Sequence, residues 1–206
     1  MKKTCLVTGG GRSGKSAYAL SLGKNAERPC FIATGWAGDE EMARRIRRHQ
    51  AERSGRWSLI ETRTDLGGAV REALAEKKAD FILIDCLTLW VSNFFFSEEG
   101  STLSMQQGIP EDLDSSRVDQ GGVSVEDRVL SAAEELAALI RRTEIPMVLV
   151  TNEVGSGIVP GEALSRRYRD LAGNVNKIIA SAVDTLVLTV CGVPLKIKGE
   201  DDSVDL

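Results

Sequence analysis

The sequence predicts an α/β domain built on a mainly parallel sheet with helices on both faces. Short apolar runs alternate along the chain with segments whose apolar residues recur at helical spacing, which is typical of this class. Glycine-rich or acidic segments follow several of the apolar runs, where ligands bind in such sheets. The chain has 206 residues, of which 42% are hydrophobic and 27% are charged. This length and composition suit one globular domain over residues 1–206.

Each predicted element follows from its own apolar pattern and from the turn residues that bound it. The predicted strands are Lys3–Thr8, Cys30–Thr34, Trp57–Glu61, Phe81–Asp85, Pro146–Thr151 and Thr185–Val190, with Pro194–Lys198 as a final hairpin arm. The predicted helices are Ser16–Ala26, Asp39–Ser54, Asp65–Lys78, Leu87–Phe96, Val125–Arg142 and Glu162–Ala182.

One segment, Ser97–Asp127, breaks this alternation. It contains Gly, Ser, Gln and Pro, and eight acidic residues against the single basic residue Arg117. Such a composition favours an exposed, mobile excursion from the domain rather than a second domain.

Charge and cysteine usage exclude several classes of protein. The net charge of −4 gives no bulk electrostatic attraction to nucleic acid or to an anionic membrane. No apolar run is long enough for a membrane span, and the one near the start is too short for a signal peptide, so we expect a cytoplasmic protein. The four cysteines are far apart and form no CxxC pair, which predicts buried free thiols: Cys5, Cys30, Cys86 and Cys191.

The first strand is followed by a phosphate-binding motif. The residues match G-x-x-x-x-G-K-[S/T] at each fixed position: Gly9, Gly10, Gly11, Arg12, Ser13, Gly14, Lys15 and Ser16. A strand before the motif and a helix after it are the required context, because backbone N–H groups and the helix N-terminus then face an anion. We expect Lys15 to reach the β- and γ-phosphates and the Ser16 hydroxyl to bind Mg²⁺. The sequence therefore predicts a P-loop NTPase fold of the RecA-like class.

A second acidic position supports a metal–nucleotide site. The strand Phe81–Asp85 is apolar and ends in a carboxylate. A carboxylate at the carboxyl end of a strand near the phosphate loop holds Mg²⁺ in such proteins, directly or through water. The alternative is an acidic residue that only begins a loop.

The predicted helix Asp39–Ser54 carries the only strongly basic stretch. Six arginines and one acid lie between Arg44 and Arg56, and the single histidine of the chain, His49, lies among them. Such a run is either a solvated helix face or a surface that contacts phosphates, for which arginine is well suited. From the residues alone, His49 is a surface histidine or a nucleophile, since a neutral imidazole can attack phosphorus near pH 7.

The chain resembles the bifunctional adenosylcobinamide kinase/adenosylcobinamide-phosphate guanylyltransferases of cobalamin synthesis. The most specific stretch is T-N-E-V-G-x-G-I-V-P, and the resemblance covers nearly the whole chain except Ser97–Asp127. The matching segments are Thr8–Ser16, Ile32–Thr34, Asp39–Ile46, Asp85–Thr88, Val150–Pro160, Arg169–Gly173 and Asn176.

The resemblance implies two reactions and a set of site residues. The γ-phosphate of ATP or GTP goes to the aminopropanol hydroxyl of adenosylcobinamide. GMP from GTP is then transferred to that phosphate through a guanylylated histidine, for which His49 is available. It also implies a homo-oligomer and further nucleotide contacts by Thr34, Gly35, Trp36, Gln50, Ala51, Glu52 and Arg53, with Glu61 on guanine and Asp85 on the metal side.

Two other functions remain open from the sequence. A P-loop kinase of another small metabolite would transfer phosphate without guanylylation. A nucleotide-dependent regulator would bind a partner without turnover.

Overall fold

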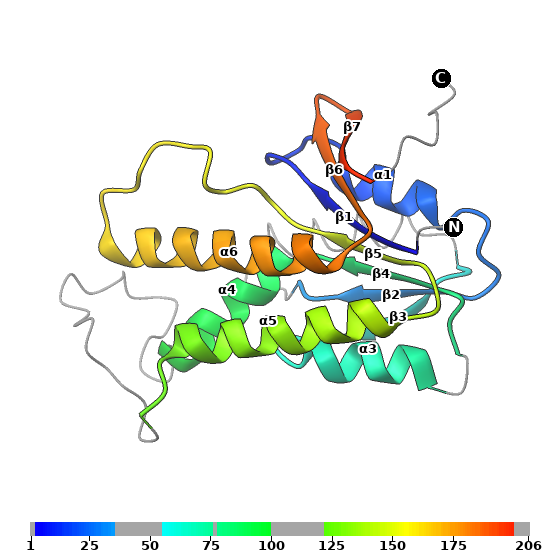
Figure 1. The fold of residues 1–206 in the computed structure, drawn as a ribbon, viewed down its shortest axis with the longest axis horizontal. Helices are drawn as coiled ribbons and strands as arrows, with labels where there is room; N and C mark the ends of the chain where they lie inside the picture. Colours follow the sequence, from blue (N-terminus) through cyan, green and yellow to red (C-terminus); the bar gives the residue numbers. More distant parts are fainter. Residues whose placement is uncertain (1–2, 36–54, 76–77, 100–121, 200–206) are drawn as a thin grey trace.

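A seven-stranded sheet forms the centre of the molecule (Figure 1). The computed structural model describes residues 3–35, 55–75, 78–99 and 122–199. Along the sheet the order is β3-β2-β4-β5-β1-β6-β7, and all neighbouring pairs are parallel except the antiparallel pair β6–β7. The mainly parallel sheet is therefore confirmed. The strands are β1 (Thr4–Thr8), β2 (Pro29–Ala33), β3 (Ser58–Glu61), β4 (Phe81–Asp85), β5 (Met147–Val150), β6 (Thr185–Val190) and β7 (Val193–Lys198).

Helices cover the two faces of this sheet unequally. On one face lie α3, α4, α5 and α6 (Figure 1). They enclose the larger apolar core, which includes Trp90 and Phe95. On the other face, α1 packs over a smaller core around Val7 and Leu83. The sequence prediction of helices on both faces is confirmed. The helices are α1 (Lys15–Leu22), α3 (Leu66–Leu74), α4 (Leu87–Glu99), α5 (Val125–Arg142) and α6 (Ala163–Ala182).

The first helix ends earlier than its sequence predicts. α1 ends at Leu22 rather than near Ala26, because Gly23 terminates it and its backbone N–H bonds to the Leu20 carbonyl at 3.2 Å. A Cβ atom at Gly23 would lie 2.7 Å from the Trp57 ring, so the packing of a distant residue fixes this position. The predicted helix over 39–54 lies outside the described residues.

The two ends of the predicted acidic excursion are helical. Residues 97–99 belong to α4, and the acids at 126 and 127 belong to the first turn of α5. The Ser124 side chain caps α5 by accepting a hydrogen bond from the Asp127 N–H at 3.1 Å. Acidic residues in a first helical turn interact favourably with the helix dipole, so these two stabilise a helix rather than a loop. Residues 100–121 lie outside the described part of the chain.

The cysteines are all free, but not all buried. Cys30 and Cys86 are buried, and burial raises the pKa of the partly covered Cys5 thiol to about 12. The prediction of a buried thiol is wrong for Cys191, which lies exposed in the turn between β6 and β7 with φ of 51°. Over the described ranges, no helix is long and apolar enough to cross a membrane.

Candidate functional site

The predicted phosphate loop connects the end of β1 to the start of α1. Two of its glycines have a backbone that other residues rarely adopt, with φ of 149° at Gly9 and 96° at Gly14. A Cβ atom at Gly9 would also lie 2.5 Å from the Thr189 carbonyl oxygen, and one at Gly14 would lie 3.1 Å from the Gly192 Cα. Glycine is therefore required at both positions by backbone conformation and by close packing.

The loop lysine lies folded against the loop itself. Lys15 is the first residue of α1 and is buried, and its Nζ donates to the Gly10 carbonyl at 2.5 Å and to the Ser13 hydroxyl at 3.5 Å. Its ammonium group is thus held at the loop that binds phosphates in this motif, at the N-terminus of a helix.

A hairpin far along the sequence supports the phosphate loop. The Ser13 and Thr189 hydroxyls are 2.8 Å apart, and the Gly192 N–H donates to the Ser13 carbonyl at 2.9 Å. The Thr189 hydroxyl also donates to the Thr8 carbonyl at 3.2 Å. These supports are not predictable from the sequence, because no local pattern relates residues separated by 176 positions.

Three predicted site residues lie together at the carboxyl ends of β2, β3 and β4. The Thr34 N–H donates to the Asp85 carbonyl at 3.3 Å. The Thr34 hydroxyl donates to the Cys86 carbonyl at 2.7 Å and accepts from the Cys86 N–H at 2.8 Å. This hydroxyl is fully buried and holds the backbone that follows Asp85. The Asn93 side chain of α4 donates to the Thr34 carbonyl at 2.7 Å, which links this edge to a helix.

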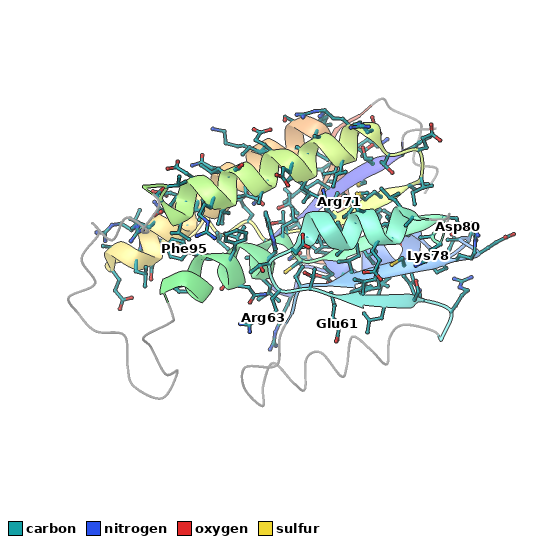
Figure 2. All side chains as sticks on the ribbon, turned by 90° about the horizontal axis from the view of Figure 1, so that it is seen from below. Glu61, Arg63, Arg71, Lys78, Asp80 and Phe95 are labelled. Atoms are coloured by element: carbon teal, nitrogen blue, oxygen red, sulfur yellow. The ribbon has the colours of Figure 1, made fainter. Side chains whose placement is uncertain are left out.

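The third of these residues, Glu61, is exposed at the end of β3 and pairs in register with Ala33. Figure 2 shows Glu61 and Arg63 on the side of β3 that faces away from α3. The strands β2, β4 and β5 separate β3 from β1. Glu61 therefore lies at the carboxyl ends of the strands, as the phosphate loop does, but with three strands between them. Gly35 follows Thr34, whereas six predicted site residues lie outside the described residues: Trp36, His49, Gln50, Ala51, Glu52 and Arg53.

The segment after β5 connects the phosphate loop to the residues around Thr34 and Asp85. The Glu153 N–H donates to the Gly9 carbonyl at 3.1 Å, so this segment lies directly beside the phosphate loop. The Asn152 N–H donates to the Thr88 hydroxyl at 2.7 Å, and the Thr151 hydroxyl donates to the Asn176 side chain at 2.7 Å. These bonds fix β5 to the start of α4 and to α6.

A groove, here called the α6 groove, runs between α6, the strands β1 and β6, and the segment after β5. Its volume is about 780 Å³. Its apolar lining comes from Leu6, Val159, Ala180 and Leu186. Its charged and amide lining comes from Arg169, Asp170, Asn174, Asn176 and Lys177. Thr8, Thr151 and Glu153 line it beside the phosphate loop, and three glycines complete it: Gly155, Gly157 and Gly173. Several of these residues lie in the segments that carry the family resemblance, but no local pattern in the sequence predicts a groove.

A tyrosine holds α6 in place beside this groove. The Tyr168 hydroxyl donates to the Thr88 carbonyl at 3.0 Å. Burial raises the pKa of Tyr168 to about 12, and the nearby Cys86 thiol adds to the rise, so the hydroxyl keeps its proton at neutral pH.

Comparison with known proteins identifies the family. The family model described as cobinamide kinase / cobinamide phosphate guanyltransferase matches residues 5–197. The chain belongs to this family. It is 38% identical over 193 residues to the bifunctional adenosylcobalamin biosynthesis protein CobU of Salmonella typhimurium strain LT2, covering 94% of this chain and 98% of that protein. It is 35% identical over 196 residues to the bifunctional adenosylcobalamin biosynthesis protein CobP of Pseudomonas aeruginosa, covering 95% and 97% of the two chains.

Solved structures support the fold. A prototypical ATPase of a bacterial type III secretion system aligns with a TM-score of 0.51 at 14% identity, covering 90% of this chain and 50% of that one. The ATPase EscN aligns with a TM-score of 0.53 at 12% identity, covering 91% and 42%. At these identities the likeness concerns the fold alone, and it agrees with the P-loop NTPase fold that the motif predicts.

Proposed function

We propose that this protein phosphorylates adenosylcobinamide with ATP or GTP and then transfers GMP from GTP to the new phosphate. The observation that carries this proposal is membership of the cobinamide kinase family, with 38% identity to a bifunctional relative over 94% of the chain. The phosphate loop and its surroundings are compatible with both reactions, because each begins with a bound nucleoside triphosphate.

In the first reaction, the acceptor hydroxyl attacks the γ-phosphorus, the bond to the β–γ bridging oxygen breaks, and a nucleoside diphosphate leaves. The backbone N–H groups of the loop and the α1 N-terminus would bind the phosphates. Lys15 would stabilise negative charge on the β- and γ-phosphates as that bond breaks. The acceptor proton leaves to solvent or to a nearby carboxylate.

The donor set suits Mg²⁺. The Ser16 hydroxyl and the Asp85 carboxylate are hard oxygen ligands, at the start of α1 and the end of β4. Only β5 lies between β4 and β1, so the backbones of the two strands are about 10 Å apart. When bound, Mg²⁺ would neutralise phosphate charge. Ser16 and Asp85 would orient it, and Thr34 would hold the backbone after Asp85.

In the second reaction, a histidine nitrogen attacks the α-phosphorus of GTP and pyrophosphate leaves, which forms a guanylyl phosphoramidate. The phosphate of the acceptor then attacks the same phosphorus, the P–N bond breaks, and the imidazole is regenerated. His49 is the proposed nucleophile, since it is the only histidine in the chain. The arginines around it would stabilise the departing charge. We also propose that the enzyme is a cytoplasmic homo-oligomer, which sedimentation and cell fractionation would test.

Labelling with α-phosphate-labelled GTP tests this assignment. The wild-type protein should acquire an acid-labile, alkali-stable label, as a histidine phosphoramidate does, and should lose it when adenosylcobinamide phosphate is added. His49→Ala should acquire no label but retain kinase activity toward adenosylcobinamide. Label on His49→Ala would refute the nucleophile, and absence of corrinoid phosphorylation by the wild type would refute the kinase.

A further inference from the structure

We propose that the α6 groove binds the corrinoid acceptor, with the macrocycle lying against the helix face at Gly173. This inference rests on the proposed function and adds to it the place where the second substrate binds. A corrinoid is a large ring with methyl-bearing faces and a rim of amide arms, one of which carries the reacting hydroxyl.

The position of the groove meets the first requirement for an acceptor site. The acceptor hydroxyl must reach the terminal phosphorus of a nucleotide bound at the phosphate loop. Thr8 lines the groove and directly precedes Gly9, the first residue of that loop. Glu153 also lines the groove, and its N–H donates to the Gly9 carbonyl at 3.1 Å. One end of the groove therefore lies at the phosphate loop.

The lining has the mixed chemistry that such an acceptor needs. Val159, Ala180 and Leu186 supply apolar contacts for ring faces. Asn174 and Lys177 are exposed on α6 and supply donors, and Asn174 also an acceptor, for amide arms. A volume of about 780 Å³ lies within the range of sites that bind sizeable organic ligands. A purely apolar partner would leave the polar groups on α6 without hydrogen bonds.

The glycine at position 173 is the most specific evidence for a ligand in the groove. It lies in the interior of α6, a helix of 20 residues, where glycine destabilises the helix relative to alanine. No positive φ requires glycine there. A Cβ atom at Gly173 would meet no atom of the described residues within 4 Å. By contrast, a Cβ atom at Gly68 in α3 would clash with the Asp65 carboxylate, so packing within the chain explains that glycine.

Within the described part of the chain, nothing requires glycine at position 173. A missing side chain leaves the helix backbone open to the close approach of a molecule outside the chain. Gly157, which lines the groove from the segment after β5, likewise has open space where a Cβ atom would stand, with no described atom within 4 Å. Neither of these two groove glycines is required by the residues that the structure describes, which indicates that the occupant is wide and passes close to both backbones.

Substitutions at Gly173 test the proposal. The full chain would be titrated with adenosylcobinamide, with binding followed by equilibrium dialysis and the absorbance of the corrinoid. Gly173→Leu should raise the Kd for adenosylcobinamide at least about tenfold, because the new side chain would occupy the groove. Gly173→Ala should raise that Kd by a smaller factor and also raise the melting temperature by about 2 °C, because the helix gains intrinsic stability. GTP binding by both variants serves as the folding control.

The matched control is Gly67→Ala in α3. Its new Cβ atom would lie 3.5 Å from the Arg71 guanidinium, an ordinary contact, and α3 does not line the groove. This variant should bind the corrinoid as the wild type does.

Wild-type corrinoid affinity in Gly173→Leu would overturn the proposal. If Gly173→Leu also showed an altered sedimentation coefficient, the groove would instead be assigned to contact with a second copy of the chain. If the wild type itself bound GTP but no corrinoid, the proposed function would fail as well, so the two failures are distinguishable.

Discussion

One end of the α6 groove lies at the phosphate loop, yet the chain builds the two sites in different ways. The phosphate loop is one contiguous segment, Gly9–Ser16, whose residue types match a known phosphate-binding motif. The groove takes its walls from β1, β6, α6 and the segment after β5. A contiguous site can thus be identified from a motif, whereas an assembled one becomes visible only when the elements are placed in space.

The glycines of the two regions show the same contrast. The fold requires glycine at position 9, because φ is 149° there. A Cβ atom at this position would also lie 2.5 Å from the Thr189 carbonyl oxygen. Gly173 has ordinary helical surroundings and open space. A glycine that the fold requires and a glycine that the fold does not require are therefore separable by substitution.

The largest expected effect separates catalysis at the loop from binding in the groove. Lys15→Ala should reduce phosphoryl transfer about 10²–10³-fold, because the charge that stabilises the transferring phosphate is lost. Corrinoid affinity should stay near that of the wild type, since Lys15 does not line the groove. Steady-state kinase assays and corrinoid titrations measure the two quantities. Lys24→Ala, beyond the end of α1, is the control, and full kinase activity in Lys15→Ala would contradict the assigned role.

A smaller effect is expected on stability when Gly9 and Gly173 are each replaced by alanine. Gly9→Ala should lower the free energy of unfolding by roughly 1–3 kcal/mol, because it introduces backbone strain and a clash with Thr189. Gly173→Ala should raise the same quantity by about 0.5–1 kcal/mol, through helix propensity. Urea unfolding of the two variants in parallel measures both. If the two changes had the same sign, the distinction between the regions would be wrong.

The smallest effect concerns the tyrosine that positions α6. Tyr168→Phe removes the hydrogen bond to the Thr88 carbonyl and should lower the free energy of unfolding by about 1 kcal/mol at pH 8. The folded-state pKa of Tyr168 is about 12, above its ordinary value of 10.0. The unfolded chain therefore loses its proton first, and this contribution to stability is lost as the pH rises from about 10 to about 12.

Urea unfolding at pH 8 and pH 11 measures this dependence. Wild type and Tyr168→Phe should differ less at pH 11, since the phenylalanine cannot ionise. An equal difference at the two pH values would argue that Tyr168 ionises normally in the folded protein.

Local patterns predicted much of the fold. The bounds of β4, β6 and α5 match the predictions, because apolar runs, turn residues and the Ser124 cap are all local signals. The end of α1 did not match, since the packing of Trp57 against Gly23 decides it. For the site, the motif correctly predicted a loop at Gly9–Ser16 between a strand and a helix. The supporting contacts from Thr189 and the groove beside α6 depend on tertiary structure. The role of His49 remains a prediction, in a segment outside the described residues.

The hydrogen bonds between the phosphate loop and the β6–β7 hairpin also bear on how the protein is synthesised. β1 lies between β5 and β6, and Ser13 contacts a threonine that the ribosome adds 176 residues later. A nascent chain that stops before β6 carries the complete phosphate motif. It lacks β6, which is one of the two strands that flank β1, and it lacks the hairpin turn. The phosphate loop is thus synthesised early, but its supporting contacts form only after the hairpin has been synthesised. A chain truncated before the hairpin would be released without these contacts.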